Sequence, residues 1–143
     1  MIEQQQGVTL IELLIVIAIF ASIAAASTPF ISSFILRNNY ETTVDKVVSS
    51  IRKAQQYAMD SKNAVSWGVC MSGDSIRLFS GSCVAPSFAE DFAIPASVSI
   101  SGLNETTFSP LRGEPSSTMN ISISTAIGSQ EVWVNAAGGM EIN

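Results

Sequence analysis

The sequence contains no histidine and only two cysteines, Cys70 and Cys83, among its 143 residues. Histidine is the side chain most often used as a general base and as a metal ligand. Two cysteines are too few for a structural zinc site. The chain also lacks a P-loop, a GxGxxG segment and a CxxC pair. These absences argue against an enzyme and predict that the protein uses no cofactor and binds no metal.

Positive charge is scarce as well. The chain has 7 Lys and Arg against 12 Asp and Glu, a net charge of -5, whereas proteins that bind nucleic acid use basic surfaces to neutralise phosphates. The C-terminal residues 136–143 contain Glu141 and no Lys or Arg. We therefore expect no nucleic-acid partner, and we interpret Arg77 and Arg112 as solvated surface charges.

Charge is absent altogether between Leu13 and Leu36, a run of 24 residues. A helix of that length extends for about 36 Å, which is enough to cross the hydrocarbon core of a bilayer. The remaining length allows one further domain. A secretory signal peptide has a basic start and a small-residue cleavage site after its apolar stretch, whereas here a short polar leader ends in Gly7 before the apolar run. A simple signal anchor remains an alternative.

Glu12 stands at the start of this apolar run, where a carboxylate is unfavourable and usually has a partner and a function. If the chain were cut after Gly7, Val8 would gain an α-amino group one helical turn before Glu12 and on the same helix face. The carboxylate would then pair with that amine or with the amine of a neighbouring copy. Such pairing would set the register between stacked helices.

The segment from Gly7 to Ile19, GVTLIELLIVIAI, resembles the N-terminal motif of type IV prepilins and type II secretion pseudopilins. The resemblance implies that prepilin peptidase cuts the chain after Gly7 and that Val8 becomes the methylated N-terminus. It also implies that Thr9 and Glu12 take part in assembly.

Pro29 matches the helix-kinking proline of that family. A proline inside a helix removes one backbone donor and crowds the carbonyl four residues earlier, so a bend is expected there. Beyond Arg37 the pattern becomes amphipathic, since Val44, Val47, Ile51, Ala54 and Ala58 form one apolar stripe at helical spacing. This stripe is expected to pack against a sheet, and the helix is expected to end near Asn63.

From Ala64 onward, short runs of alternating apolar and polar residues are separated by turn signals such as Ser72-Gly73-Asp74 and Gly138-Gly139. The predicted fold class is α+β, a type IV pilin fold in which a long N-terminal helix, membrane-spanning in its first half, packs on an antiparallel β-sheet head. The expected segments are the leader 1–7, the transmembrane and filament-core helix 8–36, the amphipathic helix 37–63 and the β-rich head 64–143.

The C-terminal pattern is similar to that of H-type (GspH/FimT-like) pseudopilins and minor pilins. It consists of a turn with Pro and Gly, two alternating strands, and a Gly turn into a short last strand, in segments 107–113, 120–123, 131–135 and 138–142. Trp67 and Trp133 are interpreted as core or sheet-face packing.

Two cysteines in an exported head suggest one disulfide between Cys70 and Cys83. A tight hairpin turn at Gly73-Asp74 argues against it, because Cys70 would then face Arg77 and Cys83 would lie beyond the reach of a disulfide. The bond requires either a wide turn or a chain that folds back at Gly81-Ser82, so the pairing stays open.

The sequence thus predicts a structural subunit of a type IV pilus or type II secretion filament, assembled through its N-terminal helix. The expected partners are other pilin or pseudopilin subunits, prepilin peptidase, the inner-membrane assembly machinery and the membrane. The expected location is the cytoplasmic (inner) membrane, single-pass with the head outside, and then an extracellular or periplasmic filament. The alternatives are a low-copy minor pilin or H-type pseudopilin, a DNA-uptake or adhesive module carried on a pilus, and a signal-anchored head that never assembles.

Overall fold

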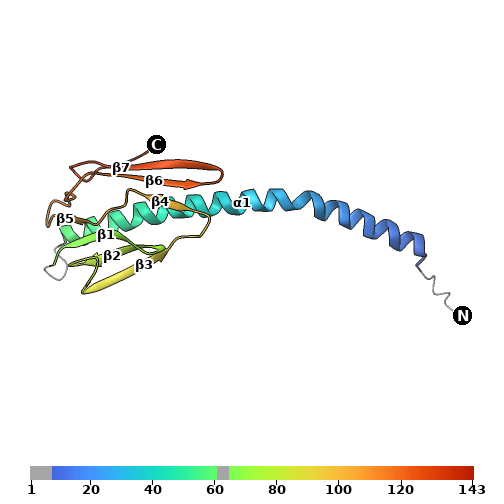
Figure 1. Ribbon diagram of the computed structural model, residues 1–143, viewed down its shortest axis with the longest axis horizontal. Helices are drawn as coiled ribbons and strands as arrows, with labels where there is room; N and C mark the ends of the chain where they lie inside the picture. Colours follow the sequence, from blue (N-terminus) through green and yellow to red (C-terminus); the bar gives the residue numbers. More distant parts are fainter. Residues whose placement is uncertain (1–7, 61–64) are drawn as a thin grey trace, which may run out of the picture. The chain divides into compact units, whose positions relative to one another are not determined.

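The structure is a computed structural model that describes residues 8–60 and 65–143, without the side chains of residues 27–29. One long helix, α1 (Leu10–Met59), precedes a set of antiparallel strands, which confirms the predicted α+β class (Figure 1). The strands are β1 (Trp67–Ser72), β2 (Ser75–Ser80), β3 (Phe88–Ala93), β4 (Ser99–Ser101), β5 (Thr106–Phe108), β6 (Met119–Thr125), β7 (Gly128–Val134) and β8 (Met140–Ile142).

The helix α1 contributes to two compact units, residues 1–35 and residues 36–143. Between Leu10 and Met59 the sequence has no glycine and a single proline, Pro29, so little interrupts helix formation over 50 residues. The helix ends at Met59, and the N–H of Asp60 still donates to the carbonyl of Gln56 at 2.9 Å. Asn63, predicted as the end of the helix, lies outside the described residues.

The strands form two four-stranded antiparallel sheets, a division that the sequence analysis left open. Sheet A has the order β3-β2-β1-β5 and sheet B the order β4-β6-β7-β8. The β1–β2 hairpin has the predicted tight turn, since Ser72 pairs with Ser75 across Gly73 and Asp74. Gly73 takes the positive φ of 57° that a two-residue hairpin loop requires at its first position.

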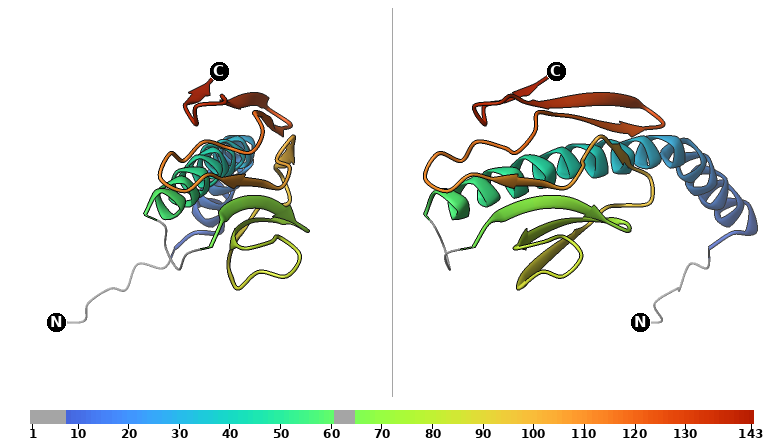
Figure 2. Two further views of the ribbon diagram at one scale, coloured as in Figure 1. Left: turned by 90° about the vertical axis from the view of Figure 1, so that its left-hand side faces the viewer. Right: turned by 60° about the vertical axis from the view of Figure 1, so that its left-hand side comes forward.

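The apolar stripe of α1 forms the centre of the core in residues 36–143. All five predicted stripe residues are buried, and the two sheets pack on different sides of this part of the helix (Figures 1 and 2). The alternating runs in β1, β2, β6 and β7 turn their apolar residues toward it. The buried strand residues include Trp67, Val69, Ile76, Leu78, Ile121, Ile123, Val132 and Val134. The predicted packing of the amphipathic segment on the head is therefore confirmed.

Candidate functional site

The N-terminus of α1 is capped by Thr9. Its Oγ1 atom accepts a hydrogen bond from the backbone N–H of Glu12 at 3.4 Å, and its carbonyl accepts one from the N–H of Leu13 at 3.2 Å. Threonine is a favoured N-cap because its hydroxyl satisfies one of the free N–H groups of the first turn. Thr9, which the family resemblance connects with assembly, therefore also determines where the helix begins.

Glu12 lies in this first turn and is exposed. A carboxylate at a helix N-terminus is favoured by the partial positive charge of the free N–H groups. Within residues 8–60 and 65–143, no ion pair involves Glu12. The sequence from Val8 to Leu36 contains no Lys or Arg, so no side chain of this segment supplies a cation for the carboxylate.

Val8 directly precedes the helix and is exposed. Gly7, the predicted cleavage position, lies outside the described residues. In the uncleaved chain the nitrogen of Val8 belongs to the peptide bond with Gly7. The ion pair expected between Glu12 and the amine of Val8 therefore concerns the cleaved chain, and it stays a prediction.

The first half of α1 has an exposed apolar surface. Every residue from Val8 to Ala26 is exposed, and the helix is long and apolar enough to cross a membrane by length and composition. Its exposed large side chains are Leu10, Ile11, Leu13, Leu14, Ile15, Val16, Ile17, Ile19, Phe20 and Ile23, followed by Phe30, Ile31, Phe34 and Ile35. An apolar surface of this extent indicates contact with lipid or with other protein chains.

Polar groups within this apolar stretch are satisfied locally. The hydroxyl of Ser22 donates to the carbonyl of Ile19 at 2.8 Å, and that of Ser33 donates to the carbonyl of Phe30 at 3.0 Å. Such bonds to the preceding turn let a serine sit in an apolar environment without water. Pro29 lies inside α1, and the kink expected there stays a prediction, because the side chains of residues 27–29 are not described.

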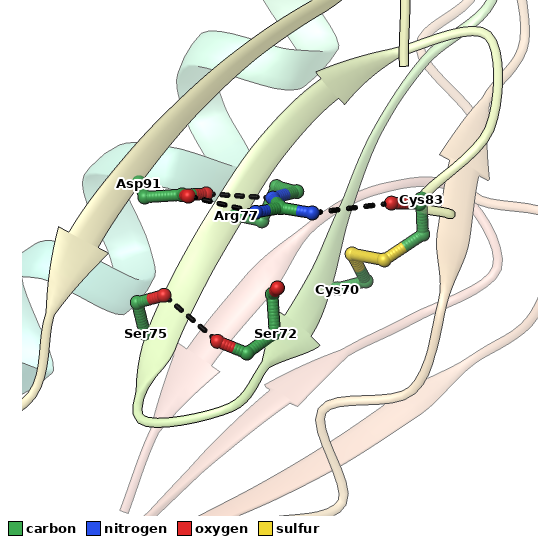
Figure 3. A network of polar contacts seen from close by, with 6 residues as sticks. All are labelled: Cys70, Ser72, Ser75, Arg77, Cys83 and Asp91. Carbon is green, nitrogen blue, oxygen red and sulfur yellow. Dashed lines mark hydrogen bonds and ion pairs between the residues drawn. A yellow bond between two sulfur atoms is a disulfide. The ribbon is translucent and has the colours of Figure 1, made fainter. Parts of the chain in front are cut away.

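The head contains the disulfide between Cys70 and Cys83, with the two Cα atoms 6.4 Å apart (Figure 3). Cys70 faces Arg77 across the tight hairpin, as expected. The bond forms because the chain folds back after β2, at Gly81-Ser82, which is one of the two conditions set out above. Gly81 has a φ of 87°, and its N–H donates to the carbonyl of Ser66 at 2.8 Å. The suggested disulfide is therefore confirmed, and the tight turn does not prevent it.

Arg77 holds the loop that contains Cys83. Its guanidinium pairs with both carboxylate oxygens of Asp91 on β3, at 2.7 and 2.8 Å, and donates from Nη1 to the carbonyl of Cys83 at 3.4 Å (Figure 3). On the other side, Glu105 accepts a hydrogen bond from the N–H of Cys83 at 3.1 Å. Arg77 keeps part of its side chain at the surface, but its strand neighbour Asp91 gives it a two-point partner that the sequence analysis did not anticipate.

The ion pair between Arg77 and Asp91 also shifts the pKa of both side chains. The hydrogen bond from Arg77 lowers the pKa of Asp91 below its ordinary 3.8, and the bond to Asp91 raises the pKa of Arg77. A carboxyl whose pKa is lower in the folded chain stabilises the fold above its unfolded pKa and loses that contribution as the pH falls through the folded value. We expect Asp91→Asn to reduce slightly the loss of stability as the pH falls below the ordinary carboxyl pKa of 3.8. Thermal melting of the wild type and the variant over this pH range measures the difference. Identical acid profiles of the two proteins would contradict the prediction.

Arg112 fits the earlier interpretation as a solvated surface charge, since its side chain is largely exposed and its Nη1 lies 3.7 Å from Glu114.

The two tryptophans differ in their exposure. Trp67 is buried, with its ring centroid 4.7 Å from that of Tyr57. Trp133 lies on the opposite side of β7 from the buried Val132 and Val134, on the exposed face of sheet B.

A metal site was not expected from the composition. In the part of the chain that the structure describes, no three His, Cys, Asp or Glu side chains gather in a group able to hold a metal ion.

Asp91 and Glu105 are the residues around the disulfide that the sequence analysis missed. The only signal for Asp91 was its place opposite Arg77 once the β2–β3 pairing is known.

Comparison with known proteins gives one match. Residues 4–28 match the family described as the prokaryotic N-terminal methylation motif. No curated protein and no solved structure matches the chain. The match spans the predicted cleavage position, Thr9, Glu12 and most of the exposed apolar stretch. The chain therefore has a type IV prepilin-like N-terminus, a motif that is typical of structural and not of catalytic proteins.

Proposed function

We propose that the protein is a structural subunit of a type IV pilus or a type II secretion filament. The apolar helix 8–36 holds the subunit in the cytoplasmic membrane, with the head outside, until prepilin peptidase removes the leader 1–7. The assembly machinery then moves the subunit into a filament, where the apolar helices of many subunits pack together. The head formed by residues 37–143 supplies the outer surface of that filament.

One observation carries this proposal. The methylation motif at residues 4–28 coincides with a helix whose apolar side chains remain exposed. Because exposed apolar surface of this extent needs a covering, it suits a segment that is first covered by lipid and later by other helices. Glu12 suits the same use, since a lone carboxylate in that segment requires a cation from a processed N-terminus.

A finer assignment, to the H-type (GspH/FimT-like) minor pilins or pseudopilins, is supported by the C-terminal half. There a Pro- and Gly-containing loop leads into two long paired strands, β6 and β7, and a glycine turn leads into the short β8. Copy number decides between this role and that of an abundant subunit. Sheared filaments that contain this chain as a minor component favour the minor pilin, and filaments built mainly of it exclude that role.

The mature protein should begin at Val8 and carry a methylated amine. The measurement is mass spectrometry of the N-terminal peptide from membranes and from purified filaments. An intact Met1 terminus in membranes, together with the absence of this chain from purified filaments, would show that the chain is a signal-anchored head that never assembles.

Replacement of Gly7 by leucine should leave the leader attached and remove the protein from filaments almost completely. A bulky side chain at the cleavage position is expected to block the peptidase, and the uncleaved chain has no amine at Val8 to pair with Glu12. An immunoblot resolves the 7-residue size difference. Gln6→Ala is the matched control, because it changes the neighbouring leader residue and should be cleaved like the wild type.

A further inference from the structure

The loop between β5 and β6 contains an unusual backbone turn. Leu111 has a φ of 67°, and the N–H of Arg112 donates to the carbonyl of Pro110 at 2.8 Å. A bond between residues two apart around a residue with positive φ is a γ-turn of the rare, strained kind. Every other positive-φ residue that the structure describes is a glycine, namely Gly73, Gly81, Gly102, Gly113 and Gly138. Leu111 alone combines this conformation with a bulky side chain.

The surrounding loop holds Leu111 in place. Gly113 donates its N–H to the carbonyl of Ser109 at 2.9 Å, and Ser109 donates its own N–H to the carbonyl of Glu114 at 2.8 Å. The helix supports the loop through Gln55, whose Nε2 donates to the carbonyl of Gly113 at 3.3 Å. Gly113 also lies so close to Met59 that an added Cβ would be 3.1 Å from its Cγ. The turn is therefore fixed by the head and is not a free loop tip.

This strained turn adds nothing to the core. Leu111 is 79% exposed, and the neighbouring Arg112 side chain is 77% exposed. A glycine at position 111 would adopt the same φ without strain. Backbone strain of this kind is concentrated at functional sites, so strain at an exposed residue that the core does not use favours a contact with another molecule. We refer to Leu111 and Arg112 as the loop patch.

A complementary surface lies on the exposed face of sheet B. Trp133 is 47% exposed there, and it is paired in register with Asn120 on β6 and Glu141 on β8. Glu131 accepts bonds through one oxygen from the indole Nε1 of Trp133 at 3.1 Å and from Nδ2 of Asn120 at 3.3 Å. We refer to Asn120, Glu131, Trp133 and Glu141 as the tryptophan patch.

The two patches match in chemistry. An indole beside two carboxylates favours a guanidinium, which stacks on the ring and pairs with the acids. The apolar part of the indole suits a leucine side chain. The loop patch presents one leucine and one arginine next to each other, and the ion pair that Arg112 makes with Glu114 in the same chain is long, at 3.7 Å, and exposed.

We propose that the loop patch of one copy docks on the tryptophan patch of a second copy of this chain. The two patches are different surfaces of the same head: the loop lies against the end of α1 at Met59, and Trp133 lies on the side of sheet B turned away from the core. A contact between different surfaces is head-to-tail, and its repetition builds an open filament. This inference rests on the proposed function, because it specifies how heads meet in that filament.

The test begins with Leu111→Gly in the full-length protein in its own cells. Incorporation into sheared filaments should fall about tenfold, while the melting temperature of the full chain in detergent stays equal or rises, because glycine removes the strain without removing core contacts. The control is Val84→Gly, which deletes an apolar side chain that is 90% exposed but has no strained φ; its incorporation should equal that of the wild type. Equal incorporation of Leu111→Gly and wild type overturns the contact.

Charge reversal tests whether the molecule that contacts the loop patch is a second copy of this chain. Arg112→Glu should reduce incorporation about tenfold, and Glu141→Arg in the same chain should restore most of it, since both patches then carry reversed charges. In assembled filaments, Leu111→Cys in one copy and Asn120→Cys in another should form a disulfide-linked dimer of this chain. A lack of rescue, or an adduct with a different protein, overturns the choice of a second copy. Absence of the wild-type protein from filaments instead contradicts the proposed function itself.

Discussion

Glu12→Gln should reduce the amount of this protein in filaments about tenfold, while the variant is still inserted, cleaved and stable. An unpaired carboxylate within an apolar helix is unfavourable by roughly 2.5–3.5 kcal/mol at the membrane centre and by less near the interface. The amine created at Val8 is the cation that can offset this, because no Lys or Arg occurs between Val8 and Leu36. Glutamine keeps the shape of the side chain and removes its charge.

The structure makes this substitution a clean test of charge. The contact between Thr9 and Glu12 uses the backbone N–H of Glu12, so glutamine leaves the cap and the start of α1 unchanged. In the membrane, we expect the wild-type carboxylate to pair with the amine of its own cleaved chain. In the filament it can pair with the amine of an adjacent subunit, which gives a reason for subunits to add in register.

Thr9→Ala is the matched control for Glu12→Gln. It removes the cap, which weakens the first turn by about 1 kcal/mol, and it keeps the carboxylate. We expect a much smaller decrease in filament incorporation than for Glu12→Gln. The measurement counts this protein in sheared filaments by quantitative mass spectrometry, since a minor subunit changes filament number little. Wild-type incorporation of Glu12→Gln would refute the pairing mechanism.

The elements with strong periodicity could be predicted from the sequence. The stripe from Val44 to Ala58 identified the buried face of α1, because residues three and four apart share one side of a helix. Alternation identified β1, β2, β6 and β7, because successive side chains of a strand point to opposite faces. The division into two sheets was not predictable, since alternation fixes the faces of a strand and not its partners.

β3 shows why part of the fold was missed. Its sequence, Phe88-Ala89-Glu90-Asp91-Phe92-Ala93, places two adjacent acids in the middle of a strand, which does not resemble alternation. Each acid has a partner from another element, since Glu90 pairs with Lys53 of α1 and Asp91 with Arg77 of β2. These pairs are 37 and 14 residues apart in sequence, so only the assembled head makes β3 favourable.

The candidate sites also differ in whether the sequence alone could indicate them. The N-terminal motif was recognisable because its residues are consecutive, from Gly7 to Glu12, and a motif depends only on their order. The loop patch was not, because a leucine gives no sign of a positive φ, and the segment was simply interpreted as a turn. The obstacle expected for the disulfide also came from local reasoning, which could not anticipate the bond from Gly81 to the carbonyl of Ser66.

That disulfide leads to the second large expected effect. Cys83→Ser should lower the free energy of unfolding of the head by about 3 kcal/mol, the loop-entropy contribution of a ring of this size. For a head of about 100 residues this corresponds to a decrease in melting temperature of about 10 °C or more. The variant is suitable because Cys70 stays in place; it is 2% exposed and behaves there as a small apolar residue.

The reason for this loss of stability lies on the outer face of sheet A. Cys70 and Phe79 are both buried although they point away from the α1 core, with Phe79 lying across Gly68, where an added Cβ would be 2.7 Å from the ring. The chain that follows β2 is tied back by the disulfide and by the bonds of Cys83 to Arg77 and Glu105. Without the disulfide, only hydrogen bonds close the loop, namely these two and the backbone bonds from Gly81 to Ser66 and from Ser87 to Ser80. The net contribution of each such bond is small.

The measurement is a thermal melt of the full-length protein in detergent, followed by the near-ultraviolet circular dichroism of the aromatic side chains in the head, such as the buried Trp67. Reductant should lower the melting temperature of the wild type to that of Cys83→Ser and leave the variant unchanged. Ser82→Ala is the control in the same loop: it removes the weak bond from Val84 N–H to Ser82 Oγ, keeps the disulfide, and should melt within about 2 °C of the wild type, since it alters one exposed contact. If Cys83→Ser melts with the control, the hydrogen bonds of the loop close it without the covalent link, and the disulfide contributes nothing measurable to the stability of the head.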